Sequence, residues 1–372
     1  MKNIALMIKP ASSRCNLRCR YCFYAEVSER RDCRSYGLMR RDTAGRIIEN
    51  IFRDLERGDS VTLAFQGGEP TVAGLDFFRF FAEKVEAVRG EVRVSWALQT
   101  NGTLLDEDWC AFLKEKDFLV GLSLDAMQAS HDENRVDAEG KGTFARVSAA
   151  RALLEMHGVE YNILTVLTNA LARHPQQVWN FLCKEDIGFV QFIPCLGGLD
   201  GGATRFSLTP GRFAAFHTQL FRLWAADLTQ GKYRSVKLFD DLIRLLAFGG
   251  CGACGLIGRC MPQIVVEADG GVYPCDFYAL DEYRVGNLAE ESLGALYEKA
   301  AMAAFRIRPT EKLKLCEACP YAPICGGGCP RMRREVCGAP EAKTCGYRAF
   351  LDACLPQMQR IAQRERNRDG GR

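Results

Sequence analysis

The chain has 372 residues, which is enough for two or three domains with a large apolar core. Hydrophobic residues make up 48% and charged residues 26%, and the formal net charge of +3 excludes a strongly basic nucleic-acid-binding surface as the leading function. No apolar run approaches the roughly 18 residues of a membrane span, and the N-terminus lacks a signal-peptide pattern, so we expect a cytoplasmic protein.

The first 235 residues alternate between short apolar runs and longer segments with helical periodicity. The predicted strands cover 4–8, 61–65, 92–98, 118–124, 161–167 and 189–193. The predicted helices cover 43–57, 75–88, 106–116, 144–157, 175–184, 209–229 and 236–247. The strands are apolar and rich in β-branched or aromatic residues, which is typical of parallel strands buried on both faces. Six β/α repeats predict an α/β fold with outer helices, either a partial barrel or a doubly wound sheet.

The composition changes from residue 236 onward, where eleven of the eighteen cysteines fall. We therefore expect a first domain over 1–235 and a smaller, cysteine-rich domain over 236–372. In the second domain, Asp269-Gly270 lies between two β-prone runs and predicts a hairpin. A helix near 292–302, a cysteine-rich loop region over 316–345 and a last helix over 346–365 complete the prediction.

Three cysteines, Cys15, Cys19 and Cys22, form a C-x3-C-x2-C motif directly after the first predicted strand. In a β/α barrel the carboxyl ends of the strands carry the active site. Three thiolates suit a [4Fe–4S] cluster whose fourth iron stays open for a substrate or cofactor. Zinc would need a fourth ligand, and none follows closely in the sequence.

Polar residues also end the third and fourth predicted strands, at 99–101 and 123–125. Because these strand ends share one face of a barrel, their side chains are candidates for the site on geometry alone. Turn formation is the alternative explanation for Asn101-Gly102.

The cysteine motif, with Tyr21 before its last cysteine, resembles that of the radical S-adenosylmethionine (SAM) superfamily. The resemblance implies a partial (β/α)6 TIM-like barrel. It further implies that the open iron binds the amino and carboxylate groups of SAM, with Tyr21 beside the cofactor, and that a 5′-deoxyadenosyl radical is the reactive species.

Further segments match this superfamily in order. Gly68 lies in a GGEP segment whose glycines permit a close backbone approach, and which the resemblance assigns to the methionine amino group. By the same resemblance, Ser123 contacts the ribose or the methionine carboxylate region. Arg135 would bind the carboxylate, for which a guanidinium group is well suited. Leu196 would pack near the adenine.

A second set of eight cysteines follows in the C-terminal part. Their number fits two four-thiolate clusters, but C-x2-C pairs also build zinc sites, so composition leaves both metals open. The region resembles the SPASM domain of peptide- and protein-modifying radical SAM enzymes, which implies two further [4Fe–4S] clusters and three in all. By position, auxiliary cluster I takes Cys254, Cys260, Cys275 and Cys329. Auxiliary cluster II takes Cys316, Cys319, Cys325 and Cys345.

Two further cysteines, Cys251 and Cys337, lie near assigned ligands and could replace one of them. Cys337 competes with Cys345. We favour Cys345 because Cys-Gly-Tyr at the start of the last predicted helix matches the family ending better.

Long strings of residues, including 8–24, 64–74 and 265–287, resemble the anaerobic sulfatase-maturating enzymes nearly end to end. That family oxidises a Cys or Ser in a C/S-x-P/A-x-R stretch of an unfolded sulfatase polypeptide to Cα-formylglycine without O2. The resemblance implies that the deoxyadenosyl radical removes a hydrogen atom from the target Cβ. It also implies that Asp276 is the base for the target SH or OH, with Tyr24 or a water as the alternative.

The expected partners are an unfolded sulfatase polypeptide and a reductant protein such as flavodoxin or ferredoxin, and we expect the chain to act as a monomer. The sequence leaves open whether Cys, Ser or both are oxidised.

Two other functions compete with this interpretation. A maturase of ribosomal peptides, forming thioether or carbon–carbon crosslinks, often carries an N-terminal leader-binding domain, whereas the first predicted strand here begins at residue 4. A non-catalytic zinc-binding interaction protein would leave the C-x3-C-x2-C loop and the GGEP segment unexplained.

Overall fold

The computed structural model describes residues 1–250, 253–261, 263–308 and 310–369. The chain forms two compact units, and neither is continuous in the sequence. The first unit comprises Met1–Leu124, His131–Tyr161 and Pro262–Arg308, and the second comprises Asp125–Ser130, Asn162–Met261 and Pro309–Arg372. The predicted domain boundary after residue 235 falls inside a short strand, β7 (Ser235–Val236), and stays a prediction.

The sheet of the first unit is built around β1, which is the first strand of the chain. The first four strands pair in parallel in chain order, β1 with β2, β2 with β3 and β3 with β4, and β8 pairs in parallel with the other edge of β1. The predicted hairpin is present as β8 and β9, and β10 pairs antiparallel with β9. The strands are β1 (Asn3–Ile8), β2 (Ser60–Phe65), β3 (Arg93–Thr100), β4 (Phe118–Ser123), β8 (Ile264–Val266), β9 (Gly271–Tyr273) and β10 (Gly286–Asn287).

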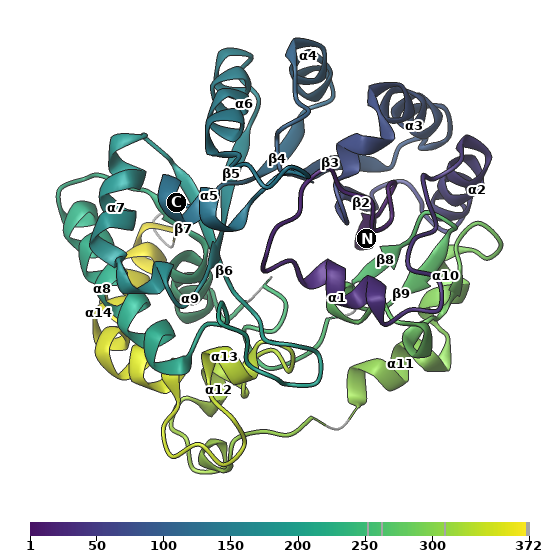
Figure 1. Cartoon of the computed structure of the whole chain (residues 1–372). Helices are drawn as coiled ribbons and strands as arrows, with labels where there is room; N and C mark the ends of the chain where they lie inside the picture. The colour runs from purple at the N-terminus through teal and green to yellow at the C-terminus, as the bar shows by residue number, and fades with distance from the viewer. Residues whose placement is uncertain (251–252, 262, 309, 370–372) are drawn as a thin grey trace. The chain divides into compact units, whose positions relative to one another are not determined.

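Helices cover the outer side of the first four strands (Figure 1). The core between strands and helices is aromatic: the ring of Phe65 lies 4.7–6.3 Å from those of Phe78, Phe81, Trp96 and Phe118. Such ring pairs add about 0.5–1.5 kcal/mol each to the burial of the apolar surface. The helices are α2 (Arg41–Phe52), α3 (Leu75–Val88), α4 (Glu107–Glu115) and α6 (Phe144–Met156). Shorter helices are α1 (Phe23–Glu29), α10 (Leu293–Tyr297) and α11 (Ala300–Ile307), and α5 (Gln128–Asn134) joins the two units in sequence.

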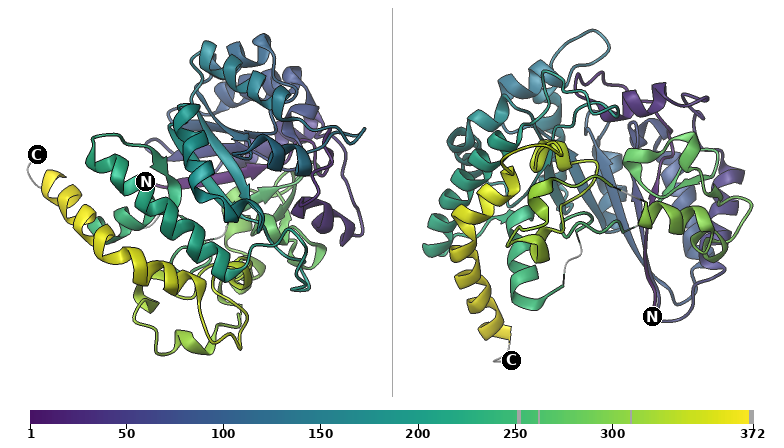
Figure 2. Two further views of the ribbon diagram at one scale, coloured as in Figure 1. Left: turned by 60° about the vertical axis from the view of Figure 1, so that its left-hand side comes forward. Right: turned by 90° about the horizontal axis from the view of Figure 1, so that it is seen from below.

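The second unit holds the parallel strands β5 (Tyr161–Leu167, all but its first residue), β6 (Phe189–Pro194) and β7. The long helices α8 and α14 pack side by side, and α14 also packs on α9 (Figure 2). Their interface buries Phe213, Phe216, His217, Phe239 and Phe350. The helices are α7 (Pro175–Lys184), α8 (Pro210–Thr229), α9 (Lys237–Phe248), α12 (Ala322–Cys325), α13 (Arg333–Val336) and α14 (Gly346–Asp369).

These elements confirm an α/β fold with a mostly parallel sheet. Some helices differ from the prediction: the helix expected over 43–57 ends at Phe52, and the one expected over 292–302 is split into α10 and α11. The split lies at Lys299, which is the N-cap residue of α11 and has an extended backbone. Its ammonium binds the Glu291 carboxylate at 2.6 Å. The helices α1, α5, α12 and α13 were not predicted.

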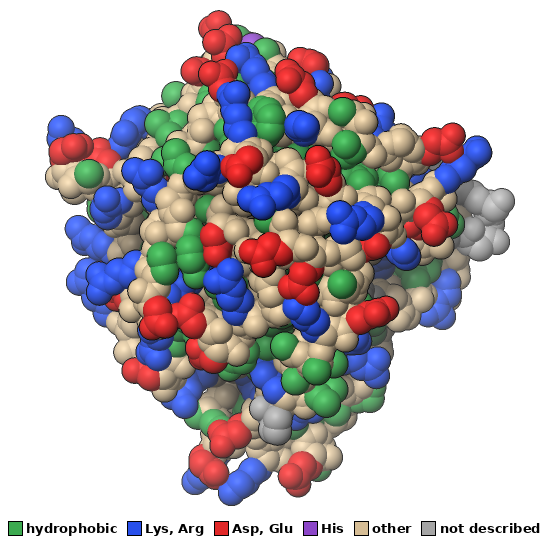
Figure 3. All heavy atoms as spheres, turned by 90° about the vertical axis from the view of Figure 1, so that its right-hand side faces the viewer, with side chains coloured by type: hydrophobic (Ala, Val, Ile, Leu, Met, Phe, Trp, Pro, Cys, Tyr) green, Lys and Arg blue, Asp and Glu red, His purple; other side chains and the backbone are tan. Residues whose placement is uncertain are grey.

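Charged side chains of both signs are interspersed on the face of the molecule in Figure 3. This face shows no large area of a single sign, in agreement with the small net charge. Within the described residues, no helix is both long enough and apolar enough to cross a membrane.

Candidate active site and cluster-binding cysteines

The first cysteine motif lies on the loop that leaves the carboxyl end of β1 and leads into α1, where Cys22 is the N-cap residue. Burial raises the pKa of the Cys15 thiol to about 12, and the nearby thiols of Cys19 and Cys22 contribute to the increase. The three sulfurs are therefore close neighbours on one loop. Metal binding replaces the thiol proton, so this donor set fits a cluster with three protein ligands.

The GGEP segment packs directly against this loop. The amide of Gly68 donates to the carbonyl of Ser12 at 2.9 Å, and the amide of Glu69 donates to that of Arg14 at 2.8 Å. A Cβ atom on Gly68 would lie 2.1 Å from the Arg14 carbonyl oxygen. Only glycine permits this approach, so Gly68 allows the GGEP segment to pack directly against the backbone of the cysteine loop. Its predicted contact with the methionine amino group stays a prediction.

Glu69 joins the ends of β2 and β3. Its buried carboxylate accepts hydrogen bonds from Thr71, from the Thr100 hydroxyl at 2.7 Å and from the Asn101 amide at 2.7 Å. The side-chain amide of Asn101 lies 3.9 Å from the Cys15 sulfur. The residues that end β3 therefore do lie at the cysteine loop, as their position in the sequence predicted.

Arg135 and Tyr21 also meet at this loop. The guanidinium carbon of Arg135 lies 5.5 Å from the centre of the Tyr21 ring, and Arg135 is buried. The segment around Arg135 pairs with the loop through backbone hydrogen bonds. Ser123 is the last residue of β4 and is buried. Leu196 follows β6 in the second unit, and its predicted contact with adenine stays a prediction.

Asp276 follows β9 and opens a short turn of 3-10 helix beside α1. Its Oδ2 atom accepts a hydrogen bond of 2.5 Å from the Tyr24 hydroxyl and one of 3.3 Å from the Gln66 side chain. Gln66 also donates to the Tyr24 oxygen at 2.7 Å. Asp276 is only 5% exposed, and its Oδ1 atom has no hydrogen-bond partner among the described residues. One oxygen is thus held in place while the other is free to accept a proton.

Tyr24 and Asp276 differ in their ability to accept a proton. Burial raises the pKa of Tyr24 well above its usual value, and the Asp276 carboxylate adds to the shift. Tyr24 is therefore a neutral hydrogen-bond donor. Burial also raises the pKa of Asp276, but the ammonium of Lys9 opposes this shift. The carboxylate, rather than the phenol, is the group able to act as a base.

A buried ionic cluster lies next to this carboxylate. Glu267 binds the ammonium of Lys9 at 2.9 Å and the guanidinium of Arg31 at 2.7 Å, and all three side chains are buried. The Lys9 ammonium also lies 4.9 Å from the centre of the Tyr24 ring. Burial would raise the pKa of Glu267, but the two cations lower it to about 2.

Lys9, Gln66 and Glu267 were not predicted as site residues. The sequence contains a signal for two of these residues, because Lys9 and Glu267 are single charged residues that directly follow the apolar strands β1 and β8. These strands pair in parallel with Ile8 opposite Val266, so the next residue of each stands at the same edge of the sheet.

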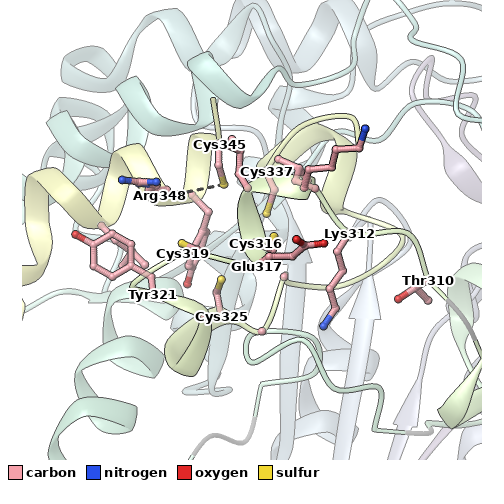
Figure 4. A pocket seen from close by; sticks show the side chains of 18 residues that line it. Thr310, Lys312, Cys316, Glu317, Cys319, Tyr321, Cys325, Cys337, Cys345 and Arg348 are labelled. Atoms are coloured by element: carbon pink, nitrogen blue, oxygen red, sulfur yellow. Dashed lines mark hydrogen bonds between the residues drawn. The ribbon is translucent and has the colours of Figure 1, made fainter. Parts of the chain in front are cut away.

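A cavity of about 510 Å³ in the second unit is lined by the predicted ligands of auxiliary cluster II. Figure 4 shows the sulfurs of five cysteines turned toward one another around it. These are Cys316, Cys319, Cys325, Cys337 and Cys345. This set of thiols fits the four-thiolate ligation of a [4Fe–4S] cluster. Across the described ranges, no three His, Cys, Asp or Glu side chains converge as a site for a single metal ion.

Cys345 has the surroundings of a thiolate. The Cys337 thiol donates a hydrogen bond to its sulfur, and backbone amides of Tyr347 and Arg348 at the start of α14 donate as well. These contacts lower the pKa of Cys345 to about 6, and the first of them raises the pKa of Cys337. The structure thus brings both competing cysteines to the cavity, and the choice of Cys345 as the ligand stays a prediction.

Three predicted ligands of auxiliary cluster I lie near one another in the second unit. Cys254 and Cys260 lie close enough to raise the pKa of Cys329, although burial is the larger cause. A Cβ atom on Gly255 would lie 2.6 Å from that of Cys329, so the two loops are in close contact. Cys275 lies in the first unit, and its place in this ligand set stays a prediction. Cys251 lies outside the described residues.

Comparisons with known proteins agree with this arrangement. Residues 10–172 match the family model described as the radical SAM superfamily, and residues 258–320 match that of the SPASM iron–sulfur cluster-binding domain. The chain is 40% identical over 336 residues to the cysteine-type anaerobic sulfatase-maturating enzyme of Clostridium novyi, covering 90% of this chain and 89% of the relative. It is 38% identical to the cysteine-type enzyme of Clostridium perfringens, covering 97% and 99%. It is 29% identical to the serine-type enzyme of Klebsiella aerogenes, covering 94% and 85%.

Solved structures give the same result. The structure described as native anSMEcpe with bound AdoMet and Cp18Cys peptide superposes with a TM-score of 0.88 at 36% identity, covering 97% of this chain and 99% of that one. SuiB from Streptococcus suis, at 19% identity and a TM-score of 0.60, shares the fold alone.

The fold and the cysteine sites define a radical SAM protein with a C-terminal SPASM domain. The chain belongs to the family of anaerobic sulfatase-maturating enzymes. The expected α/β fold, the use of SAM and the binding of iron–sulfur clusters are thereby confirmed.

Proposed function

We propose that this protein oxidises a cysteine of an unfolded sulfatase chain, within a C-x-P/A-x-R stretch, to Cα-formylglycine without O2. The identity of 38–40% with cysteine-type enzymes, against 28–29% with serine-type enzymes, favours cysteine as the target. The observation that carries the proposal is the buried carboxylate of Asp276, with one oxygen held and the other free.

The reaction removes a hydrogen atom from the target Cβ, a proton from its thiol and one electron. The product of these three losses is a thioaldehyde. Water then converts it to the aldehyde and releases hydrogen sulfide. When bound, SAM and the clusters supply the hydrogen-atom acceptor, a 5′-deoxyadenosyl radical, and an acceptor for the electron.

The residues of this chain position the substrate and move the proton. Asp276 accepts the thiol proton at its free Oδ1 atom. Tyr24 and Gln66 hold Oδ2 through two hydrogen bonds, which restricts the orientation of the carboxylate. Lys9 favours the charged carboxylate and keeps it able to act as a base.

We assign the three clusters as follows. Cys15, Cys19 and Cys22 hold the first cluster, with Tyr21, Gly68, Ser123, Arg135 and Leu196 around SAM. The two auxiliary clusters are held by the cysteines predicted for them. A reductant protein of the flavodoxin or ferredoxin type supplies the electron for the first cluster.

Asp276→Asn tests the role of the carboxylate, because it keeps the size of the side chain and removes the basic oxygen. The reconstituted variant is incubated anaerobically with SAM, dithionite and a peptide that contains Cys-x-Pro-x-Arg and carries deuterium at the target Cβ. We expect deuterium to appear in 5′-deoxyadenosine while formylglycine, measured by mass spectrometry, falls at least 100-fold, which is roughly the contribution of a general base.

Asp281→Asn is the control, because Asp281 is a partly exposed carboxylate five residues further along the chain. It should retain formylglycine formation. A near-normal yield from Asp276→Asn would contradict the role of Asp276. A wild-type protein that transfers deuterium from neither the Cys peptide nor the matching Ser peptide would contradict the proposed function.

A further inference from the structure

The turn that carries Asp276 lies in a segment with little regular structure. It follows β9, and both β9 and its partner β8 have only three residues. So short a pair of strands has few ladder hydrogen bonds with which to fix the turn that follows it. The turn itself is a single 3-10 turn (Asp276–Tyr278), which the buried Ala279 ends. Its position therefore depends on contacts with other elements.

Arg31, which lies just beyond the end of α1, contacts both ends of this segment. Its Nε atom donates to the carbonyl of Ala279 at 2.5 Å, and its Nη2 atom binds the carboxylate of Glu267, the residue after β8, at 2.7 Å. Its guanidinium carbon lies 5.6 Å from the centre of the ring of Tyr273, which ends β9. The donors of a guanidinium group have fixed directions, so these contacts hold the two ends of the segment at a set separation. The side chain is 1% exposed, and water does not compete for its bonds.

The same helix also contacts the carboxylate directly. Tyr24, in the first turn of α1, donates to Oδ2 of Asp276 at 2.5 Å, and the rings of Phe23 and Phe277 lie 5.1 Å apart. The helix thus holds the side chain of Asp276 near its start, while Arg31 holds the backbone of the turn near its end. Without the guanidinium group, the turn would be fixed to this helix at one end only.

We propose that Arg31 is a positioning residue for the proton-transfer step, which fixes the turn of Asp276 and thereby the place at which its Oδ1 atom meets the target thiol. This inference rests on the role of Asp276 proposed above. A displacement of a reacting group by about 1 Å can cost about 100-fold in rate. A loosened turn should therefore slow proton transfer, while hydrogen-atom abstraction from the target Cβ continues.

The test compares Arg31→Gln, Arg31→Lys and a control in the fully reconstituted protein. Glutamine removes the charge and the forked donor, whereas lysine retains the charge. The control is Arg30→Gln, because the neighbouring Arg30 forms an exposed pair with Glu26 at 2.9 Å. Each protein is incubated anaerobically with SAM, dithionite and the deuterated Cys-x-Pro-x-Arg peptide.

The measured quantity is the ratio of formylglycine to 5′-deoxyadenosine. Loss of folded protein or of iron lowers both products together, so a merely structural role would leave this ratio unchanged. Hydrogen exchange over residues 276–283 is followed by mass spectrometry in the same proteins without peptide, and it reports the position of the turn independently of activity.

We expect Arg31→Gln to lower the ratio at least about 10-fold while deuterium still appears in 5′-deoxyadenosine. Hydrogen exchange over 276–283 should be faster than in the wild type. Arg31→Lys should lower the ratio less, because its ammonium can still pair with Glu267, and Arg30→Gln should match the wild type. A wild-type ratio in Arg31→Gln would overturn the proposal. A lower ratio without faster exchange would overturn it as well, because the turn would then not have loosened.

If Arg31→Gln does not fold, Arg31→Lys decides, and a wild-type ratio in that variant overturns the proposal. The wild type and Asp276→Asn are assayed in parallel. No formylglycine from the wild type, or a normal yield from Asp276→Asn, would contradict the proposed function. A normal ratio in Arg31→Gln beside a low yield from Asp276→Asn would reject this inference alone.

Discussion

The ammonium of Lys9 and the carboxylate of Glu267 form an ion pair of 2.9 Å in which both side chains are almost fully buried. With Arg31 and Asp276 they make a group of two cations and two carboxylates, which is neutral when Asp276 is ionised. This balance explains how a protein can keep a charged base in a buried site.

Removal of the shared carboxylate should be costly. Glu267→Gln leaves Lys9 and Arg31 buried without their partner, and we expect the free energy of unfolding to fall by about 3–5 kcal/mol. Anaerobic denaturant unfolding measures the change. Glu86→Gln is the matched control because it removes an exposed pair with Arg89, and such pairs contribute about 1 kcal/mol or less. Equal effects of the two substitutions would contradict the importance of the buried cluster.

The first cysteine loop should hold the only cluster that supports cleavage of SAM. Replacement of Cys15, Cys19 and Cys22 together by Ala should remove about four irons per chain and abolish formation of 5′-deoxyadenosine. Cys33→Ala, which alters an exposed cysteine near the same loop, should change neither quantity. Deoxyadenosine from the triple variant would show that SAM binds at another cluster.

Gly68→Ala should displace the cysteine loop without touching a cysteine. The new Cβ atom would lie 2.1 Å from the Arg14 carbonyl oxygen, so the backbone next to Cys15 has to move. We expect lower iron content and much slower cleavage of SAM. Gly45→Ala, inside α2 with no atom within 4 Å of the new Cβ, should be neutral or stabilising by up to about 1 kcal/mol. A Gly68→Ala variant with normal iron and normal cleavage would refute this packing argument.

His217 should make the second unit sensitive to pH. Burial among the aromatic rings of α8 and α14 lowers its pKa from 6.5 to about 4, so the unfolded chain binds more protons than the folded chain between these values. Stability should therefore decrease as the pH falls, by ~1.4 kcal/mol between about pH 7.5 and 5.5. His217→Phe should remove this part of the pH dependence, while the exposed His174→Gln should not. Parallel stability curves for wild type and His217→Phe would contradict the prediction.

The sequence predicted the strands β1–β6, the hairpin of β8 and β9, most helices and the position of the cysteine loop, because apolar periodicity and motif spacing are local signals. The two-residue strands β7 and β10 were not predicted. It did not predict that β8, a strand of three residues, pairs with β1, since partner and register depend on contacts between distant segments. The ionic cluster of Lys9 and Glu267 depends on that pairing and was missed with it. Cys337 shows the same limit: spacing placed it near the ligands of auxiliary cluster II, and its convergence with four other cysteines on one cavity is visible only in the structure.

The pairing of β1 with β8 also has a consequence for the synthesis of the protein. The two strands are about 260 residues apart, and the first unit is interrupted by a long segment of the second. At a translation rate of about 5–20 residues per second, roughly 13 to 50 seconds pass between the synthesis of β1 and that of its partner β8. During this time Lys9 has no carboxylate to bind and the base Asp276 has not been made. The first cysteine loop of a nascent chain is therefore synthesised well before the residues that complete the oxidation.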